Sequence, residues 1–237
     1  MTDPKDPELR IKKLLDPGTS SLISSHDQSG MLASRGSIKG NPVIVFASDP
    51  TVQGGALGAD GAKVIVKAYK VAMAESLPVI GIWHSGGARL RDGVLSLHAF
   101  GEVFQSFITA SGKIPQLSLV LGPTAGGGAY GPALTDVVVL APEGRIFVTG
   151  PDVVKSVTGE NVDMEKLGGP EAHKKNSGLT HIIATTEDEA FEDIRVLTSL
   201  FANQGHIDVK LKDTDLAPHV PESRKRIYEV HPLVENL

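Results

Sequence analysis

Residues 122–131 read Gly-Pro-Thr-Ala-Gly-Gly-Gly-Ala-Tyr-Gly and form the stretch that decides the predicted fold. The apolar run before it, Gln116–Leu121, has the character of a buried strand. Tyr130–Thr135, at its end, is a short candidate helix. Three consecutive glycines, Gly126–Gly128, leave main-chain N–H groups unscreened by side chains at this strand-to-helix turn. Such groups bind either a phosphate or a developing oxyanion, and the predicted chemistry depends on which.

Strand and helix patterns alternate on both sides of this stretch, from about residue 43 to residue 204. The continuous apolar run Pro78–Trp83 indicates a strand buried on both faces. Ala62–Glu75 and Val94–Ala110 carry apolar residues at helical spacing. Further expected elements are a helix beginning at Pro151–Val157 and strands at Asp136–Leu140, Arg145–Thr149 and His181–Ala184. The alternation predicts an α/β fold with a mostly parallel sheet.

The N-terminal part precedes this alternation. Residues 1–30 are expected to form a peripheral helical or irregular extension, whose short amphipathic segment stops at Asp16–Gly18. The domain itself is expected to span residues 31–237. It opens with a hairpin whose strands, Leu32–Ile38 and Val43–Ser48, flank a Lys-Gly-Asn turn.

A capping signal marks the last long helix. Thr186 is the predicted N-cap, and Glu189 follows three residues later, so the pair has the spacing of a capping box. The helix is expected to run to about Gln204. Beyond Gly205 the chain is polar and irregular, with a short helix expected around Glu222–Val230.

The composition excludes several classes of function. With 237 residues the chain is long enough to bury one sizeable core or two small ones. Its net charge of -5 gives no support for nucleic-acid binding, and no apolar run approaches the roughly 20 residues that cross a membrane. The absence of cysteine excludes disulfides, thiolate nucleophiles and cysteine-ligated zinc. The charged N-terminus lacks a signal-peptide core, so a cytoplasmic location is the default expectation.

Glycine-rich loops follow three of the expected strands. They are Gly54–Gly58, Ser85–Arg89 and Gly126–Gly128. Because the carboxyl ends of parallel strands lie at one edge of a sheet, the three loops are expected to meet there, where open α/β folds place their sites.

A dinucleotide site is the alternative that the glycines suggest. Gly126, Gly128 and Gly131 have the required spacing, and Glu143 lies near the expected acidic position. However, the next strand follows after only a few residues, and Pro132 interrupts the helix that would cross over. No Walker motif is present. The spacing therefore favours an oxyanion site.

Conventional catalytic side chains are scarce. Ser85 lies next to His84 but not in a Gly-x-Ser-x-Gly elbow, and neighbouring residues on a strand point in opposite directions. The eight histidines show no metal-ligand spacing, so no metal is expected, and no pair of carboxylates stands out. Main-chain donors without a side-chain base suit the stabilisation of a thioester enolate, where each donor contributes about 3–4 kcal/mol. The acid–base group would come from the substrate or a cofactor.

The sequence resembles a known family, the carboxyltransferase (β) subunits of biotin-dependent acyl-CoA carboxylases. The resemblance runs in order along nearly the whole chain. The matching stretches are Leu14–Gly18, Val52–Gly58, Gly86–Arg89, Ala110–Gln116, Ala125–Tyr130, Pro132–Asp136, Phe147–Lys155, Val157–Glu160, Leu167–Gly169 and Lys175–Gly178. Within the family, Ile82–Gly87 is most similar to the actinobacterial acetyl/propionyl-CoA type.

The resemblance implies a crotonase-like (ClpP/crotonase) ββα superhelix and a defined reaction. Carboxybiotin on a separate carrier protein releases CO2, the biotin ureido nitrogen takes the α-proton of acetyl-CoA or propionyl-CoA, and the enolate attacks CO2. Biotin and a CoA thioester are thus the implied cofactor and substrate. Gly126 and Gly127 correspond to the family's oxyanion glycines. The other implied substrate-binding residues are Gly54, Gly55, Gly86, Gly87, Ala88, Arg89, Gly128, Tyr130 and Lys155.

The family's subunits are about twice as long, with two similar halves, and this chain matches only the N-terminal one. The implied partners are a C-terminal carboxyltransferase half, a biotin carboxylase and biotin carrier subunit, and further copies in an oligomer such as the family's hexamer. Two alternatives remain at this point. One is a crotonase-fold decarboxylase of malonyl thioesters, and the other is a non-catalytic half that completes a partner's site.

Overall fold

The computed structural model describes residues 3–25, 27–202, 214–223 and 225–236. The chain forms two compact units, Met1–Asn203 and Gln204–Leu237. The first contains every strand of the described chain. The second contains two short helical segments, η4 (Ala217–His219) and α9 (His231–Glu235). The prediction of a short helix around Glu222–Val230 is wrong, because the described residues of that range are not helical.

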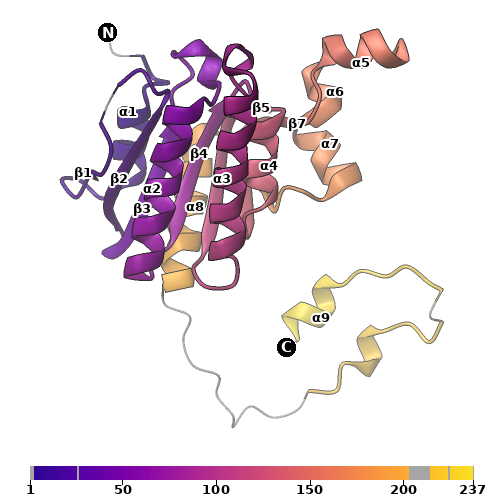
Figure 1. Cartoon of the computed structure of the whole chain (residues 1–237). Coiled ribbons are helices and arrows are strands. Elements are labelled where there is room, and N and C mark those ends of the chain that lie inside the picture. Colours follow the sequence, from indigo (N-terminus) through magenta and orange to yellow (C-terminus); the bar gives the residue numbers. More distant parts are fainter. Residues whose placement is uncertain (1–2, 26, 203–213, 224, 237) are drawn as a thin grey trace. The chain divides into compact units, whose positions relative to one another are not determined.

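One mixed sheet organises the first unit (Figure 1). The strand order is β1-β2-β3-β4-β5-β6-β8, and β7 pairs with β5 off this path. β1, β2 and β3 are antiparallel, and every pairing from β3 onward is parallel. The strands are β1 (Ser21–Leu22), β2 (Met31–Ile38), β3 (Asn41–Ser48), β4 (Val79–Ser85), β5 (Gln116–Ala125), β6 (Val137–Leu140), β7 (Arg145–Phe147) and β8 (Ile182–Ile183). The predicted α/β arrangement and the opening hairpin are confirmed.

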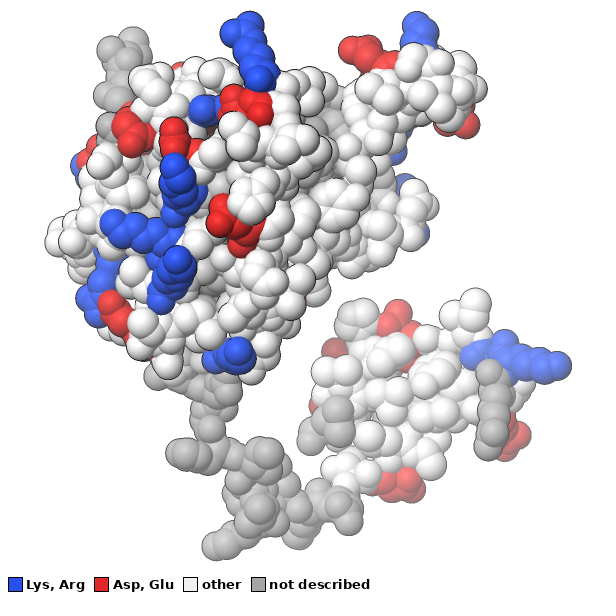
Figure 2. Space-filling model, viewed as in Figure 1, with Lys and Arg blue, Asp and Glu red and all other residues white. Residues whose placement is uncertain are grey.

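Helices cover both faces of this sheet. α2 (Ala59–Glu75) and α3 (Val94–Ala110) lie on one face, and α8 (Glu187–Ala202) lies behind it (Figure 1). The core on the α2 and α3 side centres on Phe46, Trp83 and Phe107, whose rings meet edge to face. The core on the other side is aliphatic and includes residues of α8. Lysines of α2, Lys63, Lys67 and Lys70, form the positive patch on the face shown in Figure 2.

The N-terminal extension takes part in the second core. α1 (Pro7–Leu14) begins at Asp6, whose carboxylate accepts hydrogen bonds from the N–H groups of Glu8 and Leu9. This cap satisfies N–H groups that have no partner within the helix. Ile11 and Leu14 are fully buried against β2 and β3, so α1 is fixed to the sheet by apolar packing.

The start of α8 agrees with the predicted cap. The Glu189 N–H donates to Thr186 Oγ1 at 3.1 Å. The Glu189 carboxylate also accepts from the N–H and hydroxyl of Thr185. The helix is described to Ala202, and its expected end at Gln204 lies outside the described residues.

Strand β5 is longer than the sequence indicates. Residues 117–120 pair with β6, and residues 123–125 continue past the end of β6 to pair with β7. On the other side of β5, its pairing with β4 has a register shift between Trp83 and Ser85. The strand therefore carries the chain directly into Gly126 and the short helix α4 (Gly127–Ala133).

Candidate active site

The first two glycine loops are joined by main-chain hydrogen bonds. The Leu57 N–H donates to Gly87 O at 2.7 Å, and the Arg89 N–H donates to Leu57 O at 3.0 Å. The Gly86 N–H donates to Gly54 O at 2.9 Å. A short parallel β-bridge thus links the loops after β3 and β4.

The third loop touches the second. A Cβ on Gly87 would lie 2.9 Å from Ala125 O and 3.7 Å from Gly126 Cα, so the main chains are in contact. Gly87 has φ +95° and Gly126 has φ +56°, and both values favour glycine. The expectation that parallel strands bring the loops to one edge is confirmed.

Three main-chain donors at this contact have no acceptor. The Gly126 N–H donates to Phe147 O at 3.1 Å, and the Gly87 N–H donates to Ser85 Oγ at 3.2 Å. The N–H groups of Ala88, Gly127 and Gly128 donate to no acceptor within the described residues. One free donor therefore remains on the second loop and two remain on the third, and Gly126 is not one of them in this structure.

Side chains crowd the space beside residues 127 and 128. A Cβ on Gly127 would lie 2.8 Å from the Phe100 ring, and one on Gly128 would lie 3.0 Å from Ser85 Oγ. Both distances are shorter than ordinary contacts, so a side chain at either position would force Phe100 or Ser85 to shift.

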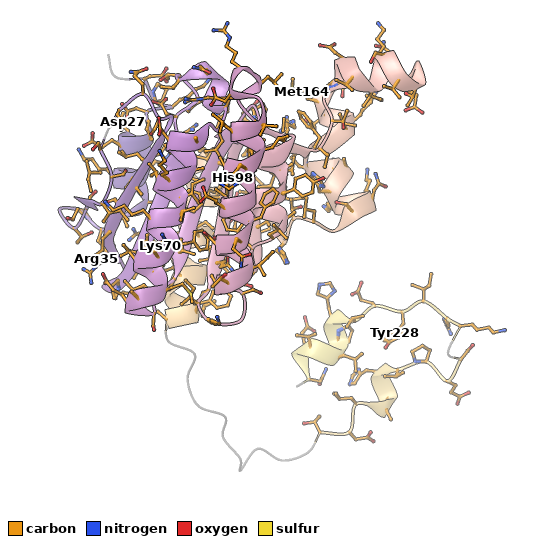
Figure 3. The ribbon with its side chains drawn as sticks, in the orientation of Figure 1. Asp27, Arg35, Lys70, His98, Met164 and Tyr228 are labelled. Atoms are coloured by element: carbon orange, nitrogen blue, oxygen red, sulfur yellow. The ribbon has the colours of Figure 1, made fainter. Side chains whose placement is uncertain are left out.

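A cleft of 330 Å³ adjoins these loops. Gly54 and Gly86, both predicted, line it together with His84. Its other walls come from the end of β5, from Phe147, from the start of α5 (Pro151–Thr158), and from Met164 of α6 (Met164–Gly168), which Figure 3 labels. Sequence reasoning missed these walls. The proline at the first turn of α5 signals the helix but not its position beside the cleft.

Three predicted residues have other surroundings. Arg89 donates from Nε to Ala56 O at 3.0 Å and from Nη2 to Ser29 O at 2.7 Å, so it ties the first loop to the segment before β2. Tyr130 is 44% exposed and its ring packs on Phe104. Lys155 is exposed on α5. None of the three lines the cleft, and of the other predicted residues only Gly54 and Gly86 do. Gly55, Gly87, Ala88 and the loop Gly126–Gly128 lie outside its lining.

His84 and Ser85 lie on opposite faces of β4, as predicted. Ser85 Oγ donates to Gly55 O at 2.7 Å, whereas His84 has a buried Nδ1 without a partner in the described chain. Both residues line the cleft. Burial, with the positive charges of Arg10 and Lys5, lowers the pKa of His84 to about 4. The ring is therefore neutral near pH 7, and it does not activate Ser85.

The described part of the chain shows no cluster of three or more potential metal ligands. In the same residues, no helix combines the length and apolarity that crossing a membrane requires.

Solved structures place this fold in a class. The chain is similar to transcarboxylase 12S, with a TM-score of 0.82 and 32% identity over 96% of this chain and 49% of that one. That structure is described as a hexamer with hydrolysed methylmalonyl-coenzyme A bound. Together with the glycine loops and their free donors, the similarity defines the class as crotonase-fold carboxyltransferases, which confirms the predicted fold.

The chain belongs to the carboxyl transferase domain family, which matches residues 19–237. It is 54% identical to the propionyl-CoA carboxylase beta chain of Rhodococcus erythropolis over 100% of this chain and 50% of that protein. It is also 54% identical to the biotin-dependent acetyl-/propionyl-coenzyme A carboxylase beta6 subunit of Mycobacterium tuberculosis, over 98% of this chain and 50% of that protein. The chain thus spans about half the length of the curated relatives it matches.

Proposed function

We propose that this chain is the acyl-CoA half of a biotin-dependent carboxyltransferase. The reaction moves a carboxyl group from carboxybiotin to acetyl-CoA or propionyl-CoA and gives malonyl-CoA or methylmalonyl-CoA. The observation that carries the proposal is a pair of unused N–H groups, on Ala88 and Gly127, presented by loops in contact. The identity to propionyl-CoA carboxylase beta chains supports the substrate class.

The two N–H groups would bind the thioester oxygen as it becomes negatively charged. Loss of the α-proton converts a thioester to an enolate, and fixed donors aimed at the enolate oxygen lower the barrier by about 3–4 kcal/mol each. Gly126 would act through its backbone conformation, because its own N–H is held by Phe147 O. Its left-handed turn brings the Gly127 N–H to the start of α4.

The cleft adjoins the loops that carry these donors, although Ala88 and Gly127 do not themselves line it. Gly54 and Gly150 line it, and a Cβ built on either glycine meets no atom within 4 Å. The walls there are bare main chain, which lets an acyl group approach closely. This fit supports a CoA thioester as the ligand of the cleft.

When bound, carboxybiotin would supply CO2 and then the ureido nitrogen that takes the α-proton. The cleft agrees with this division of roles, because His84, with a pKa of about 4, is a weak base at neutral pH. We propose that the residues that hold biotin belong to the C-terminal half, in a continuation of this chain or in a partner. A biotin carboxylase and its carrier would supply carboxybiotin, and further copies would complete an oligomer.

The experiment is a reconstitution. Carboxybiotin carrier and propionyl-CoA or acetyl-CoA are supplied to this chain with and without a C-terminal half, and the malonyl- or methylmalonyl-CoA formed is measured. Product only in the combined sample supports the proposal. Full activity of this chain alone, or no activity and no CoA binding in the combined sample, would overturn it.

Avidin separates this function from a malonyl-thioester decarboxylase, which needs the same enolate stabilisation but no biotin. Carboxylation that avidin abolishes supports the proposal, whereas avidin-resistant release of CO2 from malonyl-CoA favours the decarboxylase. Binding of CoA to the isolated chain tests the other alternative, since a half that only completes a partner's site would not bind it.

A further inference from the structure

A second cavity, of 460 Å³, adjoins the cleft. It shares His84, Pro123 and Met164 with the cleft, and Arg10 of α1 and Lys5 also line it. It therefore lies where the N-terminal helix meets the loops that follow β4 and β5.

Arg10 is the unusual residue of this cavity. The residue is only 4% exposed, and its Nε and Nη1 atoms are buried without a hydrogen-bond acceptor in the described residues. It forms no ion pair within the same part of the chain. A buried guanidinium is normally paired, because removing its charge from water is costly without a partner.

The carboxylates that line the cavity do not supply that partner. Glu187 is bonded to Lys13 at 3.2 Å. Glu143 is exposed to solvent. The other arginine of the cavity, Arg145, is occupied, since it pairs with Glu165 and donates to the carbonyl oxygens of Pro142 and Gly144. Arg10 is thus the guanidinium of this cavity that has no hydrogen-bonded carboxylate among the described residues, and Glu187, Asp3 and Asp49 act on it only through their charge.

The His84 ring faces the same charge. Its Nδ1 is also buried without a partner in the described chain, and Arg10 and Lys5 are the charged groups that lower its pKa, after burial. The charged groups that act on the imidazole are therefore cations.

We propose that this cavity binds a small carboxylate or bicarbonate-like oxyanion, held by the Arg10 guanidinium. One such anion would supply the hydrogen-bonded negative charge and acceptor oxygens that Arg10 lacks. Arginine is suited to planar oxyanions because its N–H groups lie in one plane. The site is distinct from the Ala88 and Gly127 donors, and its occupancy needs no catalysis, so its failure would leave the proposed carboxyltransferase function untouched.

The test is an anion titration of the whole chain, at about pH 8, followed by the melting temperature and by the NMR signals of the His84 ring. Bicarbonate and acetate are the probes, phosphate tests the size of the anion, and sodium chloride at equal ionic strength is the control. The variants are Arg10→Met, which removes the charge at similar length, and Arg10→Lys, which keeps it. Lys12→Met is the matched control, because Lys12 is exposed on the same helix and paired with Glu8.

We expect bicarbonate or acetate to raise the melting temperature and to shift the His84 signals saturably in the unmodified chain and in Lys12→Met. Arg10→Met should raise the titration midpoint at least about tenfold and, without added anion, should melt no lower than the unmodified chain, because it removes an unpaired buried charge. No saturable shift beyond that of sodium chloride, an unchanged midpoint in Arg10→Met, or binding of phosphate alone would overturn the proposal. If Arg10→Met fails to fold, the titrations of the unmodified chain and of Arg10→Lys still decide.

Discussion

The N–H of Gly126 donates a hydrogen bond to the carbonyl oxygen of Phe147 at 3.1 Å. This bond extends the pairing of β5 with β7 by one residue. It also engages the N–H of Gly126, the glycine at the turn. The next N–H along the chain, that of Gly127, is consequently the first one free to face a ligand. A short strand about twenty residues further on thus decides that the Gly126 N–H is bonded, whereas the Gly127 N–H is not.

Removing the Gly127 N–H should reduce carboxyl transfer by about 100- to 1,000-fold, the usual effect of losing one oxyanion donor. Gly127 is the first residue of α4, where proline is tolerated, so Gly127→Pro deletes the N–H. Because a Cβ at this position would contact Phe100, the change is made in a Phe100→Ala background. Steady-state kinetics of the reconstituted enzyme provide the measurement.

The matched control is Gly127→Ala in the same background, which adds a Cβ but keeps the N–H. It should retain most of the activity of Phe100→Ala alone. Equal activity of the proline and alanine variants would show that this N–H takes no part in the reaction.

Replacing Arg89 with methionine should destabilise the chain by about 1–3 kcal/mol, because the guanidinium donates to the carbonyl oxygens of Ala56 and Ser29. Urea unfolding gives this value, and limited proteolysis should cut the first glycine loop more readily. Arg91→Met, at an exposed position nearby, is the control and should change little. A raised KM for the CoA substrate with unchanged stability would instead assign Arg89 to ligand binding.

His84 should remain neutral until the pH falls well below 6. Its pKa is about 4 in the folded chain, against an ordinary value of 6.5, so protonation is easier after unfolding. The contribution of His84 to stability is therefore complete above pH 6.5, declines as the pH falls from 6.5 to about 4, and is then lost. Titration of the ring by NMR gives the pKa directly.

His84→Gln should flatten the stability profile over that range of pH, measured by chemical unfolding. His181→Gln makes a comparison at an exposed histidine elsewhere on the sheet. A ring that titrates near 6.5 would contradict the burial and charges described for His84.

Asp16 should stabilise the fold at neutral pH and lose that effect in acid. Hydrogen bonds from the main chain at Gly40, followed by those from Arg195 and Lys39, lower the pKa of its carboxyl group. A lowered folded pKa means that the stabilisation is present above the ordinary pKa of about 3.9 and disappears as the pH falls through the folded value.

Asp16→Asn should therefore cost about 1–3 kcal/mol at pH 7 in urea unfolding, with the difference from the unmodified chain shrinking below about pH 4. Asp60→Asn, at an exposed residue that pairs with Lys63, serves as the control and should show little effect. A cost that stays constant in acid would mean that the charge of Asp16 is unimportant.

The sequence predicted the parts of the fold that depend on local pattern. Pro78–Trp83 is apolar at every position because β4 is covered on both faces, and the spacing in Val94–Ala110 matches α3, whose bounds are the same. The meeting of the three glycine loops was predictable because parallel strands end at one edge. The resemblance to a family supplied the crotonase type of fold, which the periodicity alone does not distinguish from other α/β folds.

The details of the site depended on contacts that periodicity does not encode. Phe147 O engages Gly126 only because β5 runs on past the end of β6, and Met164 reaches the cleft from a helix far along the chain. The burial of Arg10 depends on how α1 packs, and the sequence showed there only a short amphipathic segment. The assignments of Arg89, Tyr130 and Lys155 to substrate binding stay predictions.

β5 pairs first with β6 and then with β7. The number of residues between β6 and β7 is therefore as important for the position of the Phe147 carbonyl as the identity of those residues. Residues 141–144 connect the two shorter strands, and Gly144 is packed so tightly that a Cβ would lie 2.6 Å from Val120 O. One inserted residue there would slide β7 along its neighbour and offer a different carbonyl to Gly126. Insertions and deletions, more than substitutions, are therefore the changes that this corner of the protein tolerates least.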